Sequence, residues 1–324
     1  MNTTVQQKNV QKLVILAVLT VIAVIAFMTI DVNFSKPKFL RFAMELRTPK
    51  LLAMLIAAFA IGAASIVFQS VINNTIVTPC LLGMNALYTL IHTLVYFVFG
   101  SASILARNSN LAFAVDLVIM GTVATFIYGY LFKKTNYNVL YVMLIGTVLS
   151  SFFGSIQSTM IRVMDPNEYE ELLLNLVASF DSVHSEIILA GALILAVMIF
   201  ILRKDIALLD VITLGKNQAI NLGVDYDRTI RRLLIGVTIC IAVATAMVGP
   251  ISFLGLILAN LARQLMKTYR HTHLMLASAM IGMMVLVAGQ CLVEHVFAYA
   301  IPVSVFITIG GGVYFLFLLL RQKR

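Results

Sequence analysis

Residues 249–263 read GPISFLGLILANLAR and follow an apolar segment, Arg232 to Val248, that is long enough to cross a bilayer. Gly249-Pro250 predicts a break there, because proline lacks an amide hydrogen and clashes with the preceding helical turn. The next apolar run, Phe253 to Ala262, is well short of the roughly 20 residues that a spanning helix needs. Broken backbone at membrane depth is tolerated only where protein or a water-filled cavity surrounds it. We therefore expect a short helix within about 249–266 and name Gly249, Pro250 and Phe253 as candidate lining of a transport pathway. A hairpin between two ordinary spans fits the spacing equally well.

The composition of the rest of the chain points to a membrane protein. Of the 324 residues, 61% are hydrophobic and only 11% are charged, which excludes an ordinary soluble domain. No stretch is both polar enough and long enough to fold as a soluble domain. We predict an all-α polytopic membrane protein whose residues 1–324 form a single transmembrane domain.

Apolar runs divide the chain into ten expected membrane segments. Polar connections separate them, among them a basic one at 31–50 and an acidic loop at 162–181. The expected segments cover residues 13–30, 51–70, 82–100, 111–132, 139–160, 186–202, 232–248, 253–262, 274–293 and 302–320. An even number of segments places both termini on one side of the membrane.

Basic residues fix the expected orientation. If the termini are cytoplasmic, 16 of the 23 Lys and Arg residues lie on the cytoplasmic side. The positive-inside rule selects this arrangement. We therefore expect both termini in the cytoplasm, and we assign the net charge of +9 to membrane topology and not to nucleic-acid binding.

The polar residues carry no sign of catalysis. The chain has no phosphate-binding G-x-x-x-x-G-K-[ST] loop, no HExxH and no CxxC, so we expect neither an enzyme nor a metal site. We interpret His271 and His273 as parts of a solvated loop. Asp116 is the only plausible charge inside a span, whereas ion-coupled carriers place ionisable groups at mid-membrane. Energy for transport should therefore come from elsewhere.

The segment at about 206–229 is the candidate for receiving that energy. It is the longest polar segment on the expected cytoplasmic side, and Gly215 and Gly223 favour two short helices within it. A short helix over Asp210 to Ile220 is one possibility. Such a compact knob could transmit force from a soluble partner, although an inert loop fits the same pattern.

The expected fifth span contains SSFFGSIQST, which is unusually polar for a bilayer. Interhelical hydrogen bonding and lining of a pathway are equally good interpretations of such residues. Our candidates for the pathway from this span, with one from the second, are Ser151, Gly154, Ser155, Gln157, Ser158 and Gln69.

From about Arg47 to Arg321 the chain resembles the FecCD (BtuC-like) permeases of type II ABC importers. The family motif Gly-x-Ile-x-Phe-Val-Gly-Leu-Ile-x-Pro-His-x-x-Arg is matched from Gly249 to Arg263, with Ala259-Asn260 in place of Pro-His. The family's Arg-Leu-Pro-Arg is similar to Arg47-Thr-Pro-Lys50. Further matches are Gln69, Asn74, Pro79, Leu81, Leu82, Gly83, Pro302, Val303 and Gly311, whereas Thr75 and Val313 replace two family prolines.

The resemblance implies a working assembly. A second permease, identical or paralogous, two ATPase subunits that hold ATP and Mg, and an extracytoplasmic siderophore-binding protein would join this chain in the bacterial cytoplasmic membrane. The chain itself would bind no cofactor. Arg47 and Lys50 would dock the binding protein, although snorkelling at the membrane surface explains them as well. The residues that would contact the ATPase are Leu214, Gly215, Ala219, Leu222, Gly223 and Arg228.

The cargo implied by the resemblance is a ferric siderophore. Cobalamin or haem carried by the same machinery is the first alternative, and an ion-coupled secondary transporter is the second. A membrane-embedded enzyme or scaffold is a third. The scarcity of charges inside the spans argues against the carrier, and the lack of a catalytic cluster argues against the enzyme.

Overall fold

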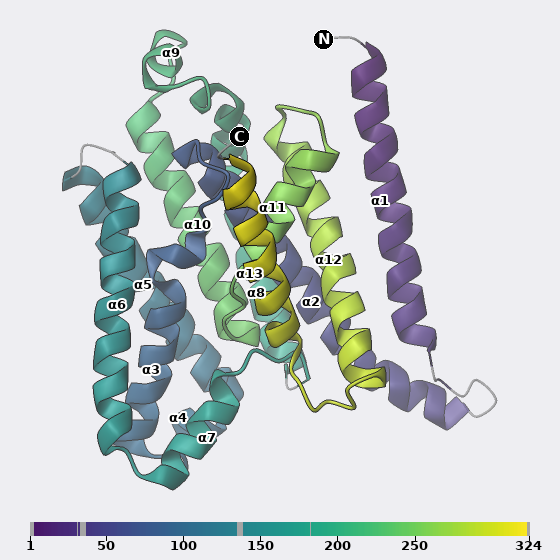
Figure 1. Ribbon diagram of the computed structural model, residues 1–324, viewed down its shortest axis with the longest axis vertical. Coiled ribbons are helices and arrows are strands. Elements are labelled where there is room, and N and C mark those ends of the chain that lie inside the picture. The colour runs from purple at the N-terminus through teal and green to yellow at the C-terminus, as the bar shows by residue number, and fades with distance from the viewer. Residues whose placement is uncertain (1–2, 31, 33–36, 135–138, 182, 323–324) are drawn as a thin grey trace.

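The computed structural model describes residues 3–30, 32, 37–134, 139–181 and 183–322, and within these ranges the regular structure is helical. The helices lie roughly along one long axis, as expected for a bundle that crosses a bilayer (Figure 1). Their bounds are α1 Thr3–Thr29, α2 Pro37–Ile72, the 3-10 helix η1 Pro79–Leu82, α3 Met84–Phe99, α4 Ile104–Arg107, α5 Ser109–Lys134, α6 Val139–Val163, α7 Pro166–Leu176, α8 Ser185–Ile212, α9 Lys216–Asn221, α10 Tyr226–Val248, α11 Leu254–Leu265, α12 His271–His295 and α13 Val303–Gln322.

Each of the ten expected membrane segments coincides with a helix. Six of these helices (α1, α2, α6, α8, α10 and α12) are long and apolar enough to cross a membrane. Shorter apolar stretches form the remaining four, α3, α5, α11 and α13. The prediction of an all-α polytopic membrane protein is confirmed.

The connection expected at 31–50 is helical over most of its length, which corrects the sequence interpretation. Helix α2 begins at Pro37 and continues through Pro49 to Ile72. Proline is favoured in the first turn of a helix, where its missing amide hydrogen leaves no bond unmade. Arg41 and Glu45 form an i,i+4 ion pair of 2.9 Å on the surface of this extension. The charges therefore mark an exposed helix and not a loop.

Two further connections also contain helices. The acidic loop expected at 162–181 includes α7, which Asp165 caps by accepting a hydrogen bond from the Asn167 amide. Helix α4 lies in the connection at 101–110. Both helices lie at one end of the bundle, which we call the α7 end (Figure 1). Helix α9 lies at the other end, which we call the α9 end, and the first turn of α1 and the last turn of α13 point toward it.

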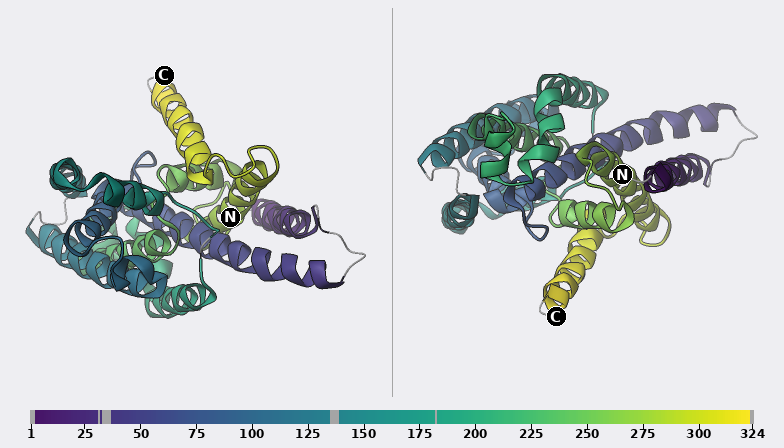
Figure 2. Two further views of the ribbon diagram at one scale, coloured as in Figure 1. Left: turned by 90° about the horizontal axis from the view of Figure 1, so that it is seen from below. Right: turned by 90° about the horizontal axis from the view of Figure 1, so that it is seen from above.

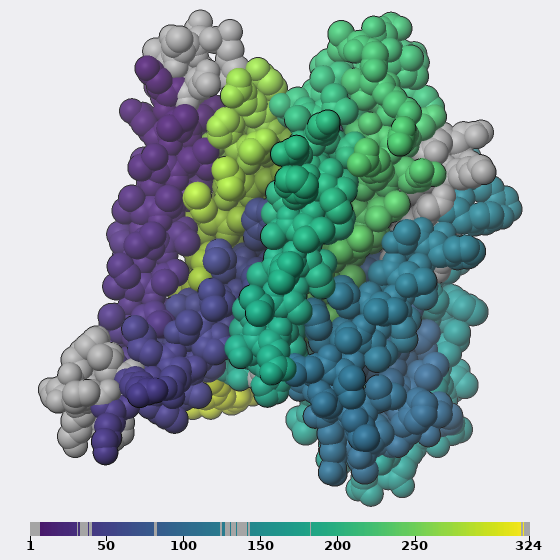
Figure 3. Space-filling view, turned by 180° about the vertical axis from the view of Figure 1, so that it is seen from behind, coloured from purple at the N-terminus to yellow at the C-terminus, as the bar shows by residue number. Residues whose placement is uncertain are grey.

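The centre of the bundle is built from α2, α10 and α12. Most side chains of α10, and of α2 from Leu51 onward, are buried, and small residues of α2 such as Ala57, Ala58 and Ala64 allow close approach of its neighbours. Seen from behind, α8 crosses the middle of one face, with α12 visible between α8 and α1 (Figure 3).

Helices α1, α6 and α13 lie at the periphery. Side chains of α1 and α6 are mostly exposed. Helix α13 projects away from the rest of the bundle in both end-on views (Figure 2). Its exposed residues include Ile309, Val313, Leu316 and Phe317. Exposed apolar side chains of this kind contact lipid or other chains when a helical bundle lies in a bilayer.

Candidate functional site

The break at residues 249–253 separates α10 from α11, as the sequence predicted. Gly249 has φ 87° and ψ 174°, a combination that is essentially restricted to glycine. A Cβ at Gly249 would lie 2.8 Å from the Cα of Ala178, so the chain between α7 and α8 runs directly against the break. The Ser179 amide donates to the Val248 carbonyl at 2.9 Å. The carbonyl of the last residue of α10 is thus satisfied by a neighbouring segment.

Phe253 ends the break in a left-handed conformation, with φ 60°, and α11 begins at the next residue. Its side chain contacts α13, since a Cβ at Gly311 would lie 2.4 Å from the Cβ of Phe253. The rings of Phe253 and Phe315 lie 6.0 Å apart. Phe253 therefore fixes the junction between the broken helix and the peripheral helix α13.

A polar cluster holds the end of α11 against α2. Arg263 donates from Nη2 to Ser70 Oγ at 2.7 Å and from Nε to Gln69 Oε1 at 3.3 Å. Gln69 in turn donates to the Thr75 carbonyl at 2.7 Å, and Asn260 donates to the same carbonyl at 2.8 Å. The cluster satisfies the backbone of the turn that follows α2. Asn260 thus has a defined role at the position where the family motif carries histidine.

The cluster also shows where the structure puts the pathway candidate Gln69. Its side chain is 1% exposed and contacts protein groups of α11 and of the turn after α2. Of the two interpretations that the sequence left open for Gln69, its position in the single chain fits interhelical hydrogen bonding.

The candidates on α6 share an open hollow on the surface of that helix. It is lined by Ser151, Gly154, Ser155, Gln157, Ser158, Thr159 and Arg162. Ser151 and Ser155 donate their hydroxyls to carbonyls four residues earlier on the same helix, at 3.1 and 2.8 Å. These two donors are therefore already used within the helix, which makes their side chains less polar toward the hollow. Gln157 differs, since Thr89 of α3 donates to its Oε1 at 3.1 Å.

The predicted knob consists of the turn after α8, the short helix α9 and the turn before α10. The single helix considered over Asp210 to Ile220 is wrong, because α8 continues to Ile212 and α9 starts only at Lys216. Gly215 separates them with φ 102°, and Gly223 follows α9 with φ 82°. Ala219 is fully buried, whereas Leu214 and Leu222 are exposed apolar side chains at the tip of the α9 end. Arg228 lies in the first turn of α10, where its amide donates to the Asp225 side chain.

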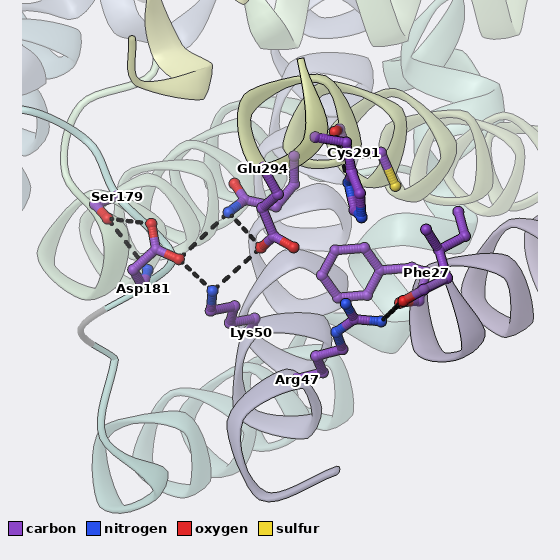
Figure 4. A network of polar contacts seen from close by, with 10 residues as sticks. Phe27, Arg47, Lys50, Ser179, Asp181, Cys291 and Glu294 are labelled. Atoms are coloured by element: carbon purple, nitrogen blue, oxygen red, sulfur yellow. Dashed lines mark hydrogen bonds and ion pairs between the residues drawn. The ribbon is translucent and has the colours of Figure 1, made fainter. Parts of the chain in front are cut away.

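At the α7 end, Lys50 is enclosed by two carboxylates (Figure 4). Its Nζ lies 2.5 Å from Asp181 Oδ1 and 3.1 Å from Glu294 Oε1. The buried amide of Gln290 donates to both carboxylates, at 3.3 and 3.0 Å. Lys50 Nζ also lies 5.4 Å from the ring centre of Tyr299. Burial raises the pKa of the Tyr299 phenol above its ordinary value of 10, so the phenol is neutral at pH 7. We call Lys50, Asp181, Gln290 and Glu294 the Lys50 cluster.

Arg47, one turn earlier on α2, contacts backbone groups instead. Its Nη1 donates to the carbonyls of Phe27 and Ile30 at 2.6 and 2.8 Å, and its guanidinium lies over the Phe27 ring (Figure 4). These bonds satisfy carbonyls at the end of α1. Both docking candidates therefore have partners within the chain.

Sequence reasoning missed the partners of these residues. Asp181, Gln290 and Glu294 lie more than a hundred positions from Lys50, so local spacing carries no signal of the cluster.

His92 was missed in the same way. Its Nε2 lies 2.8 Å from Asp116 Oδ2, at a cavity of about 150 Å³ between α3, α5 and α7. His271, expected in a solvated loop, is buried. Over the described part of the chain, no three His, Cys, Asp or Glu side chains are placed to hold a metal ion.

The fold and its sites define a multi-pass helical membrane protein with a broken helix, a polar peripheral face and a projecting knob. Residues 10–321 match the model of the FecCD transport family, and the chain belongs to this family.

Two relatives are named as permease proteins of import systems. The chain is 35% identical over 321 residues to the petrobactin import system permease protein YclO of Bacillus subtilis (strain 168), which covers 98% of this chain and 99% of the relative. It is 32% identical over 280 residues to the petrobactin import system permease protein FatC of Bacillus anthracis, covering 86% of this chain and 78% of the relative.

A solved structure has the same fold. It is an inward-facing conformation of a metal-chelate type ABC transporter, and it matches with a TM-score of 0.81 and 22% sequence identity. The match covers 98% of this chain and 100% of the solved chain. At this level of identity the likeness concerns the fold alone.

Proposed function

We propose that this chain is the transmembrane permease subunit of an ATP-binding-cassette importer that carries a ferric siderophore across the bacterial cytoplasmic membrane. The observation that carries the proposal is its full-length similarity to a petrobactin permease, at 35% identity over 98% of the chain. Cobalamin and haem remain the alternative cargoes, and uptake assays separate them. The chain is a transport subunit, and hydrolysis of ATP with Mg takes place on its partner subunits.

The position of the knob supports a role in coupling. It lies at the α9 end, toward which both chain termini are directed (Figure 1). We assign this end to the cytoplasm by the distribution of basic residues. Leu214 and Leu222 then offer exposed apolar contacts to the ATPase subunit beneath this permease, and a second ATPase subunit would lie beneath the second permease. The buried Ala219 anchors α9.

The open face of α6 supports a pathway between two permeases. Its hollow is polar, and the hydroxyls of Ser151 and Ser155 that line it already donate within α6, so these two side chains would hold a passing chelate only weakly. A second permease, identical or paralogous, would close this face and cover the exposed side of α13. Gly249, Pro250 and Phe253 would shape the pathway from within by setting the start of α11.

Docking of an extracytoplasmic siderophore-binding protein at Arg47 and Lys50 stays part of the proposal. Charged groups at such a rim mainly steer encounter and register. Because Lys50 is held by Asp181 and Glu294, a docking carboxylate would have to compete with both of them. Charge reversal at Arg47 should therefore weaken docking with little effect on the Lys50 cluster, and more strongly at low salt than at high salt.

The test is radiolabelled iron uptake in cells with and without the gene, over a panel of ferric siderophores, cobalamin and haem. Loss of uptake of one ferric siderophore class, restored only beside an active ATPase, is the expected result. Loss of cobalamin or haem uptake alone would replace the cargo. Uptake that is sensitive to an uncoupler but not to vanadate would favour a secondary transporter.

A further inference from the structure

His271, the first residue of α12, contacts Asp210 in the last turn of α8. The Asp210 carboxylate oxygen Oδ1 accepts a hydrogen bond from the His271 amide at 3.0 Å and lies 2.5 Å from His271 Nδ1. The His271 side chain is 4% exposed and that of Asp210 is 32% exposed, so the histidine side of this contact is shielded from water. Arg270, which precedes α12, makes no side-chain cap bond. Asp210 therefore caps α12 from another helix, where its negative charge also faces the positive end of the helix dipole.

On the α8 side, Asp210 is joined tightly to the knob. Thr213 Oγ1 donates to the Asp210 carbonyl at 3.2 Å, and the Gly215 amide donates to the Ile212 carbonyl at 3.0 Å. Only this short hydrogen-bonded turn separates Asp210 from α9. A displacement of α9 would therefore also displace the Asp210 carboxylate.

The knob is also joined to α10 by an ion pair, and its own turns are hydrogen-bonded. Lys216 Nζ lies 2.9 Å from Asp227 Oδ1, and the Val224 amide donates to the Ala219 carbonyl at 3.0 Å. Further along, Arg232 of α10 lies 3.5 Å from Asp205 of α8. The knob and the adjoining ends of α8 and α10 are thus held together by several polar contacts.

On the other side of the contact, α12 reaches the elements that shape the proposed pathway. It packs against α2, α11, α13 and α1. Helix α1 holds the end of α11 and the connection to α12, since Lys12 donates to the Leu265 carbonyl and Asn9 to the Lys267 carbonyl. A shift of the first turn of α12 is therefore passed to the broken helix α11.

We propose that Asp210 and His271 are positioning residues that transmit movement of the knob to α12, and through α12 to the pathway. Apolar contacts between α8 and α12 permit sliding, whereas one carboxylate that holds both an amide and a ring nitrogen fixes the distance and the register of the two helices. This inference rests on the proposed function, because it requires an ATPase that moves the knob.

The test uses the complete importer, reconstituted in liposomes with its ATPase subunits and binding protein, and radiolabelled ferric petrobactin as cargo. The measured quantity is ATP hydrolysed per iron transported. In Asp210→Ala and in His271→Ala this ratio should rise by about tenfold, within the range reported for residues that modulate coupling between sites. The double variant should be no worse than Asp210→Ala, because that variant already removes both bonds of the carboxylate, whereas His271→Ala removes only the ring contact and keeps the amide bond. Thr272→Ala, an exposed neighbour, is the matched control.

A second readout follows the contact itself in the purified chain. Hydrogen exchange of the first turn of α12 should rise by about fivefold in Asp210→Ala, as expected for the loss of a helix cap, and stay unchanged in Thr272→Ala. An unchanged transport ratio in both single variants, with ATP-driven uptake in the wild type, would overturn the coupling role alone. A parallel fall of hydrolysis and uptake at constant ratio would show a purely structural contact and overturn it too. Wild-type uptake indifferent to ATP would overturn the proposed function and the coupling role with it.

Discussion

Replacing Gly249 by alanine tests the geometry of the break most sharply. The substitution adds one methyl group at a residue with φ 87° and ψ 174°. That methyl group would lie 2.8 Å from the Cα and 3.2 Å from the amide nitrogen of Ala178. Backbone atoms cannot rotate away as the end of a side chain can. The segment between α7 and α8 would have to move, together with the hydrogen bond from Ser179 to Val248.

Two contributions set the magnitude. Holding a residue other than glycine in this region of φ and ψ costs about 1–3 kcal/mol. Forcing a methyl group into filled space costs typically about 1–3 kcal/mol more. We therefore expect Gly249→Ala to lower the free energy of unfolding by about 2–6 kcal/mol. Thermal unfolding of the purified chain in detergent should show this as a midpoint lower by about 4 °C or more.

Gly121→Ala is the matched control, because a Cβ at Gly121 meets nothing within 4 Å. It should be neutral or slightly stabilising, since alanine is the better helix former. Ala178→Gly combined with Gly249→Ala should recover only part of the loss, because the Cα and the amide nitrogen of residue 178 remain. A midpoint for Gly249→Ala equal to that of the control would refute this account of the break.

Three further substitutions test the other sites. Lys50→Ala should lower the free energy of unfolding by about 1–3 kcal/mol, because it leaves the buried Glu294 side chain without a cation. Arg41→Ala, at an exposed ion pair, should change it by less than about 1 kcal/mol. Equal effects of the two substitutions on unfolding in detergent would contradict the role of the Lys50 cluster. Gly223→Leu should abolish iron uptake while membrane insertion, measured by fractionation, stays normal, because φ 82° at this position disfavours any side chain; normal uptake and ATPase binding would count against the knob. Ser155→Leu should reduce uptake without shifting the unfolding midpoint, because Ser155 is exposed in the hollow of α6; unimpaired transport would remove α6 from the pathway.

Much of the fold was predictable because membrane segments are set by local composition. Each of the ten expected segments corresponds to a helix, and the break at Gly249-Pro250 lies where the missing amide hydrogen of proline predicts it. The start of α2 was not predictable in the same way. The polar residues at 31–50 were interpreted as a connection by composition, whereas helical spacing within α2 pairs Arg41 with Glu45. Composition alone does not separate an exposed helix from a loop.

The environment of the site residues depends on contacts that sequence spacing does not encode. Gln69 was named as pathway lining because it is a polar residue in an apolar span, yet Arg263, far along the chain, accounts for one of its bonds. Lys50 was named for its charge near the membrane surface, yet Asp181 and Glu294 come from two other elements. By contrast, the candidates on α6 come from one polar stretch of sequence, and the structure places them around one surface hollow, whereas their role in a pathway stays a prediction.

The measurement that tests the central claim most directly is radiolabelled iron uptake with and without this gene, with vanadate and an uncoupler applied separately. The account predicts that deletion abolishes uptake of one class of ferric siderophore, and that the wild-type uptake is blocked by vanadate and persists with the uncoupler. Uptake that is unchanged across the panel in a cell without a redundant system would contradict the assignment of cargo. Uptake that is lost with the uncoupler and persists with vanadate would contradict the ATP-driven importer itself.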